Sequence, residues 1–286
     1  MMRVGKMPRR LLWLWITTLL ACANAAGVPE SAVLSAATNA VRSRLVLVYA
    51  DLSASVPDTA WDRPMVRLAG ELIPGDRLVL LPISDRAPER PLLDTVIPGS
   101  GADRVSVRLG LSTRESRRRA TGTALALGSL MRARVGAARE GSAARHTAIV
   151  DAVCHAVQVG QSNRDREVVA LVLTDGIEES GLANLAHSRP KVQDAIHLAR
   201  TLRASGNCTA APSWPRIRLV GLRHSTDTPA LTRWWGVLLQ ELSYPLRAED
   251  VSSHPLGSLL GTERDALMAV RDPGQGVASS ARGGRR

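Results

Sequence analysis

The chain has 286 residues, of which 45% are hydrophobic and 22% charged, the composition of a globular protein long enough for one large core or two small ones. Its formal net charge is +11, but aromatic residues make up only 3% of it. Because none of them lies near the basic clusters, the stacking platform of a single-strand nucleic-acid binder is missing. Nucleic acid is therefore excluded as the expected partner.

The first 25 residues have the layout of a secretory signal peptide: a basic head, the apolar stretch "LLWLWITTLL" and the small residues "ACANA". The apolar stretch is too short to span a bilayer, which takes about 20 helical residues. Cleavage after Ala25 would discard Cys22, whereas "LLAC" also resembles a lipobox that would leave Cys22 lipidated. An exported protein is expected either way, periplasmic or secreted or a lipoprotein, and the arginine-rich, phenylalanine-free composition indicates a bacterial one.

Removing this segment leaves 33 basic and 26 acidic residues, a net charge of +7. It also leaves Cys154 and Cys208 as an even pair in an oxidising compartment. A disulfide between them and two unrelated thiols, one on a helix face and one in a loop, are both open from the sequence.

Strands and helices alternate from residue 44 onward. In chain order we expect a strand at 45–50, helix 58–73, strand 77–83, helices 121–135 and 147–159, strand 167–175, helix 190–204, strand 217–222, helix 228–242, strand 246–250 and helix 256–270. Strict alternation at 103–111 predicts an antiparallel or edge strand, with 92–97 as its hairpin partner.

This alternation predicts an α/β fold: a doubly wound, mostly parallel sheet with helices on both faces and one antiparallel edge strand. We expect a linker at 26–41, the domain at 42–252, a C-terminal helix at 253–271 and a disordered basic tail at 272–286. In such sheets, ligands bind outside the carboxyl ends of the strands.

Polar side chains follow two of the apolar strands at that edge. Asp51, Ser53 and Ser55 leave the first strand at two-residue spacing, which lets an extended turn point three oxygens to one side. Carboxylate and hydroxyl oxygens suit a hard cation, Mg²⁺ or Mn²⁺, although the same residues are common in ordinary turns. Thr147 precedes a helix, where its hydroxyl would cap the first turn or reach a metal, and Asp175 ends a second strand.

The sequence "DLSAS" at 51–55, followed by Thr147 and then by "TDG" at 174–176, resembles the metal-ion-dependent adhesion site of von Willebrand factor type A domains, over residues 42–252. The resemblance implies that Ser53, Ser55 and Thr147 give hydroxyl oxygens to the cation. It implies that Asp51 and Asp175 act directly or through water, and that an acidic side chain of a partner protein fills the open position. With few direct carboxylates, the cation keeps net positive charge and attracts an anion strongly.

Several residues depart from that pattern. His146 stands where many family members have glycine, and we expect it to face solvent. Glu178 and Glu179 would either add a carboxylate to the site or be solvated loop charges, and the sequence favours the second reading. The long connection 88–141, with arginines at 114 and 117–119, has no counterpart in the motif.

The leading expectation is a protein-binding module without enzymatic activity, and two alternatives remain open. A metal-dependent phosphatase or phosphotransfer enzyme would use Asp51 as nucleophile, but Ser53 stands where its general acid would be expected. The other alternative is a metal-free scaffold that binds through its basic face. No Gly-x-Ser-x-Gly, HExxH or P-loop motif is present in the sequence.

Overall fold

The computed structural model describes residues 43–57, 59–84, 90–99, 114–141, 146–186, 189–206, 208, 215–223, 227–245, 250–252 and 259–260. For residues 114–119 only the backbone is described. The predicted signal peptide, the predicted linker, the predicted basic tail and the strand predicted at 103–111 lie outside these residues. Within the described part, no helix is both long enough and apolar enough to cross a membrane.

The described strands form a six-stranded sheet in the order β3-β2-β1-β4-β5-β6. Their bounds are β1 Arg44–Asp51, β2 Arg77–Ile83, β3 Leu93–Val96, β4 Glu167–Leu173, β5 Arg216–Val220 and β6 Val251–Ser252. All neighbours pair in parallel except β2 and β3, which are antiparallel. This confirms the predicted fold class.

The two central strands explain why the sheet is parallel and covered on both sides. Every residue of β1 is buried, and so is every residue of β4 after Glu167. A strand buried on both faces needs a continuous apolar run rather than an alternating one, and both sequences supply it. Because β1 and β4 are direct neighbours, their carboxyl ends lie side by side.

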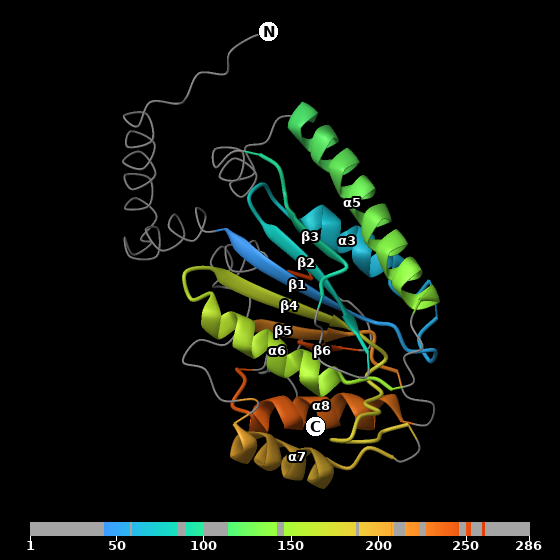
Figure 1. Ribbon diagram of the computed structural model, residues 1–286, viewed down its shortest axis with the longest axis vertical. Coiled ribbons are helices and arrows are strands. Elements are labelled where there is room, and N and C mark those ends of the chain that lie inside the picture. The colour runs from blue at the N-terminus through green and yellow to red at the C-terminus, as the bar shows by residue number, and fades with distance from the viewer. Residues whose placement is uncertain are drawn as a thin grey trace, which may run out of the picture.

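Five helices of the described chain pack on the two faces of the sheet (Figure 1). On one face lie α6 Ile149–Ser162, α7 Val192–Ser205 and α8 Thr228–Glu241, and on the other α3 Asp62–Glu71 and α5 Arg114–Glu140. Each layer has its own buried cluster, one containing Trp234 and Trp235 and the other Met65 and Met131. The sheet separates two hydrophobic cores.

The antiparallel edge strand of the described sheet is β3, which lies within the predicted strand 92–97 and pairs with β2. The strand predicted at 103–111 lies outside the described residues. The structure differs from the predictions at two elements. Helix α5 is much longer than the predicted 121–135, because the alanine- and arginine-rich stretch up to Glu140 continues the helix. The strand predicted at 246–250 is β6, displaced to Val251–Ser252. Of the predicted helix 256–270, only Leu259 and Leu260 are described, in a bend.

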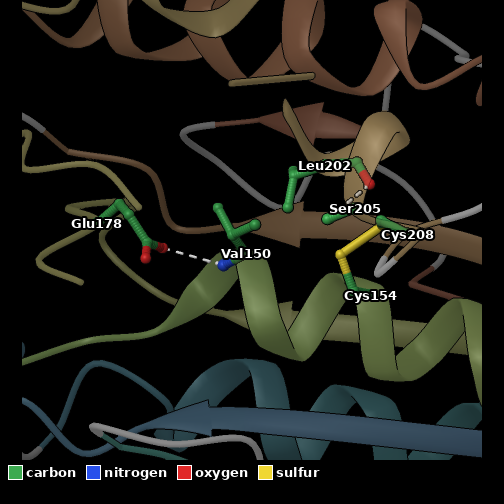
Figure 2. Close-up of a disulfide and its surroundings, with 6 residues drawn as sticks. All are labelled: Val150, Cys154, Glu178, Leu202, Ser205 and Cys208. Carbon is green, nitrogen blue, oxygen red and sulfur yellow. Dashed lines mark hydrogen bonds between the residues drawn. A yellow bond between two sulfur atoms is a disulfide. The ribbon is translucent and has the colours of Figure 1, made fainter. Parts of the chain in front are cut away.

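Cys154 and Cys208 form a disulfide, which decides the question that the sequence left open. Figure 2 shows the bridge running from the middle of α6 to the segment that follows α7. Both cysteines are buried in the same core cluster, and 54 positions separate them in the sequence. The bond therefore ties two helices of one layer together.

Candidate functional site

The carboxyl ends of β1 and β4 place Asp51 and Asp175 at the same edge of the sheet. Asp51 is the last residue of β1, and Asp175 follows β4 by two positions. Ala50 pairs with Leu173 in the adjacent strand, so the two chain exits start from neighbouring positions. The negative charge of Asp175 is close enough to contribute to a raised pKa at Asp51.

Hydrogen bonds fix the carboxylate of Asp51 on both oxygens. The main-chain N–H of Ser53 donates to Oδ1 (2.8 Å), and the hydroxyl of Thr174 donates to Oδ2 (2.7 Å). The indole of Trp61 donates to the main-chain oxygen of Asp51 (3.4 Å). Burial raises the pKa of Asp51 to about 6, although the hydrogen bonds from Ser53 and Thr174 lower it. Asp51 is thus a buried, fully oriented group, as expected for a carboxylate that acts on a ligand through its neighbours or through water.

Ser53 and Ser55 turn their hydroxyls toward each other. The two Oγ atoms are 3.0 Å apart, with Ser53 buried and Ser55 exposed. This spacing suits a hydrogen bond, and it also matches the separation of about 2.9 Å between adjacent oxygens of an octahedron around Mg²⁺. The turn thus holds two hydroxyls close together, one on a buried residue and one on an exposed residue.

Arg139, near the C-terminal end of α5, contacts the main chain of this turn, although it lies far from the turn in the sequence. Its guanidinium donates to the main-chain oxygen of Ser53 (2.9 Å) and to that of Val56. No local pattern predicts this contact, because 83 or more positions separate the arginine from the two residues that it contacts. Only the path of α5 across the sheet brings them together.

Thr147 is buried immediately before α6, and the main chain around it is hydrogen-bonded to the loops that follow β2 and β4. The N–H of Ala148 donates to the oxygen of Ser84 after β2 (3.1 Å), and the N–H of Glu179 donates to the oxygen of Thr147 itself (3.0 Å). Thr147 is therefore fixed between the loops that leave β2 and β4.

Glu178 caps α6, a role that the sequence had offered to Thr147. One carboxylate oxygen, Oε2, accepts from the N–H of Ile149 (2.7 Å) and of Val150 (3.0 Å), as Figure 2 shows for Val150. Glu178 is fully buried, so the expectation of a solvated loop charge is wrong for it, whereas Glu179 is half-buried. Burial raises the pKa of Glu178 to about 7. The local sequence could not separate the two glutamates, since the choice depends on where α6 begins in space.

A sharp turn follows Asp175. Its Oδ1 accepts from the N–H of Ile177 (2.9 Å), and Gly176 has a φ of 83°, a left-handed conformation that favours glycine. Thr174 completes the turn, because its Oγ1 accepts from the N–H of Gly176 (2.9 Å) while donating to Asp51. Thr174 belongs to the quoted motif, but the sequence assigned it no role.

The structure thus brings Asp51, Ser53, Ser55, Thr147 and Asp175 to one edge of the sheet. It leaves His146 exposed, as expected. Among the described residues there is no group of three or more His, Cys, Asp or Glu that could hold a metal. A cation here would rest on two carboxylates and several hydroxyls, a set of hard oxygens that fits Mg²⁺ or Mn²⁺ and not a softer metal.

No protein-family model matches the chain, and no curated protein does. Among solved structures, the chain is similar to the manganese-loaded TRAP protein of Plasmodium vivax, with 15% sequence identity and a TM-score of 0.34. The match covers 69% of this chain and 63% of that chain. Identity and TM-score are too low for this similarity to identify a family or a function.

Proposed function

We propose that the chain is a protein-binding module of the von Willebrand factor type A kind, which uses a divalent cation to bind an acidic side chain of a partner protein. The observation that carries the proposal is the pair of hydroxyls of Ser53 and Ser55, 3.0 Å apart beside the oriented carboxylate of Asp51. Hydroxyls arranged in this way at the carboxyl edge of a parallel sheet suit a hard cation with an open position.

The residues of the proposed site have two roles: some supply oxygens to the cation, and others fix the loops that carry those oxygens. Ser53, Ser55 and Thr147 would supply neutral oxygens, while Asp51 and Asp175 would balance part of the charge. Thr174, Arg139 and Glu178 fix the loops that carry these groups. The bound cation would supply an electrophilic centre for one oxygen of the partner's carboxylate. Ser55, the exposed hydroxyl, marks the side from which the partner would approach.

Two further properties belong to the same proposal. We place the protein outside the cytoplasm, periplasmic or secreted, because of the signal-like layout of residues 1–25; a lipid on Cys22 would anchor it to the membrane surface. We also propose that it is not an enzyme. Both oxygens of Asp51 accept hydrogen bonds, and Ser53 occupies the place of a second aspartate, so Asp51 is poorly arranged as a nucleophile.

Cation binding is tested directly by titrating the purified chain with Mn²⁺ and following free Mn²⁺ by electron paramagnetic resonance. We expect saturable binding that Mg²⁺ competes away and that Ser53→Ala weakens by more than about tenfold, since one direct ligand is lost. Ser129→Ala, at an exposed position of α5, is the matched control and should bind as wild type does. Absence of saturable binding to wild type would contradict the proposal.

Partner binding is tested by capture from an envelope extract with Mg²⁺ or with chelator. We expect a protein that is retained in Mg²⁺, released by chelator and not retained by Thr147→Ala. Retention that ignores the cation would favour the metal-free scaffold instead. Metal-dependent phosphatase turnover that Asp51→Asn abolishes would show an enzyme.

A further inference from the structure

The chain between β4 and α7 folds into a short hairpin beside the candidate cation site. Its two arms meet in an antiparallel bridge between Glu179 and Asn184. The N–H groups of Leu185 (2.8 Å) and Ser180 (3.0 Å) each donate to a main-chain oxygen of the opposite arm. At the tip, the hydroxyl of Ser180 accepts from the N–H of Leu182 (3.1 Å). The hairpin is therefore an ordered turn up to its tip.

The first arm of this hairpin is attached to the candidate site. The N–H of Glu179 donates to the main-chain oxygen of Thr147 (3.0 Å). Three residues of extended chain span at most about 11 Å, so Leu182 at the tip lies within that distance of Glu179. A standard interface covers about 800 Å² of each protein, which is a disc of about 16 Å radius. A partner centred on Thr147 would therefore also cover the tip.

Leu182 is exposed at this tip although it is apolar. Its side chain is 40% exposed, and nothing lies within 4 Å of the place that a Cβ would take on the preceding Gly181. In the second arm, Leu185 is 4% exposed and packs with Ala183 in the core cluster of the α6 layer. Because the core holds this arm, the hairpin cannot turn to bury Leu182 without exposing Leu185.

The two loops beside the candidate cation position expose no charged side chain among their described residues. Residues 52–57 expose Ala54, Ser55 and Pro57, and residues 180–185 expose Gly181, Leu182 and Asn184. The centres of protein interfaces are likewise depleted of charged residues, which gather at the rim. The other large apolar side chains exposed in the described chain belong to β3 and α5: Val96, Leu125 and Leu130.

We propose, on the basis of the cation site proposed above, that Leu182 is an apolar contact of the partner-binding surface. The partner then presents a large apolar side chain close to the acidic side chain that the cation binds. The cation supplies the charged centre of the surface, and Leu182 distinguishes among acidic partners. A partner with an apolar group at this place removes the leucine from water, whereas a partner that is only acidic does not.

A display library of random twelve-residue peptides tests this on the full chain. The library is bound to the purified protein in Mg²⁺ and eluted with chelator. We expect the eluted peptides to be enriched in aspartate or glutamate and, at a fixed separation from it, in a large apolar residue. On Leu182→Ser protein, the acidic enrichment should persist and the apolar enrichment should disappear.

The possible failures of this selection are distinguishable. Acidic peptides without an apolar enrichment, or an apolar enrichment that survives Leu182→Ser, contradict the role of Leu182 and leave the cation site standing. A selection that yields no chelator-eluted peptide contradicts both the cation site and the contact.

Synthetic peptides then measure the contact by fluorescence anisotropy in Mg²⁺. Wild type should bind the most enriched peptide about three- to tenfold more tightly than a version with serine at its apolar position, whereas Leu182→Ser should bind both alike. Leu130→Ser is the matched control, because Leu130 is 41% exposed on α5, and it should discriminate as wild type does. Leu182→Ser should also keep the Mn²⁺ affinity of wild type. Loss of that affinity would mean that the hairpin supports the cation site instead of contacting the partner, and would overturn the proposal.

Discussion

At the scale of single residues, the candidate site depends on side chains that hold other side chains. Thr174 orients Asp51, and Glu178 fixes the helix that follows Thr147. Neither would coordinate a cation in the proposed arrangement. The sequence pattern predicts which residues would be cation ligands, but it could not predict which residues orient them, because a supporting hydroxyl or carboxylate has no sequence mark of its own.

Gly176→Ala should destabilise the fold by about 2–4 kcal/mol. Alanine is strained in the left-handed backbone conformation of this position, and its methyl group would be crowded by neighbouring side chains. The new Cβ would lie 2.5 Å from a methyl carbon of Leu222. Chemical denaturation measures the loss. Gly206→Ala is the control: it also has a positive φ, but nothing lies within 4 Å of its Cβ, so about 1 kcal/mol is expected. Equal losses of stability in the two variants would show that the neighbouring side chains move away from the new methyl group, so that crowding adds no cost at Gly176.

His155 should make stability depend on pH in the acidic range. Its Nδ1 shares a hydrogen bond with the hydroxyl of Tyr49 (2.7 Å), and burial lowers the pKa of the imidazole. The unfolded chain therefore binds more protons than the fold below about pH 6.5, and the free energy of unfolding falls as pH drops.

Urea unfolding at pH 7.5 and 5.5 checks this for wild type and His155→Gln. Wild type should lose more stability on acidification than the variant does. Asp51 and Glu178 have raised pKa values and contribute with the opposite sign, but they do so in both proteins, so the difference isolates the histidine. A variant that loses as much stability as wild type would contradict the assignment.

At the scale of elements, α6 is the helix that joins the candidate site to the rest of its layer. The N–H groups of its first turn donate to the carboxylate of Glu178, and one turn later Cys154 bonds to Cys208 beyond α7 (Figure 2). The sequence predicted α6 to within a few residues from its apolar periodicity. It could not predict the disulfide, because pairing depends on where α7 ends relative to α6.

Removing the disulfide should destabilise the protein by up to about 4 kcal/mol, the loop-closure entropy for a crosslink of this span. The double variant Cys154→Ser and Cys208→Ser should show this loss in urea unfolding. Reductant should lower the stability of wild type to the same level and leave the double variant unchanged. A wild type indifferent to reductant would mean that the bond is absent in solution.

The C-terminal end of α5 acts on the turn after β1 through Arg139. Arg139→Ala should cost about 1–3 kcal/mol of stability, because the main-chain oxygens of Ser53 and Val56 lose a charged donor in a part-buried place. Arg134→Ala, exposed on the same helix, is the matched control and should change stability little. Equal effects of the two substitutions would indicate that Arg139 acts through helix propensity alone.

At the scale of the whole molecule, apolar runs were enough to predict the sheet. The short, continuous apolar runs of β1 and β4 predict buried strands, and the helices between the strands predict parallel crossovers. The two outermost strands of the sheet were predicted less well. Strand β3 has alternating exposure, and β6 is two residues long, so little apolar surface marks either of them. The C-terminal extent of α5 was missed because the helix continues, through residues of high helix propensity, beyond its last buried residue, Val135.

The three loops of the candidate site come from chain segments that meet only after the sheet has formed. Residues 51–55, 147 and 174–176 share no local structure that would survive unfolding, so the unfolded chain would have almost no affinity for the proposed cation. Ligand binding and folding then become linked equilibria: each tenfold rise in cation above its dissociation constant adds about 1.4 kcal/mol to the free energy of unfolding. The metal content of the surroundings would set how long the protein survives there, in addition to what it binds.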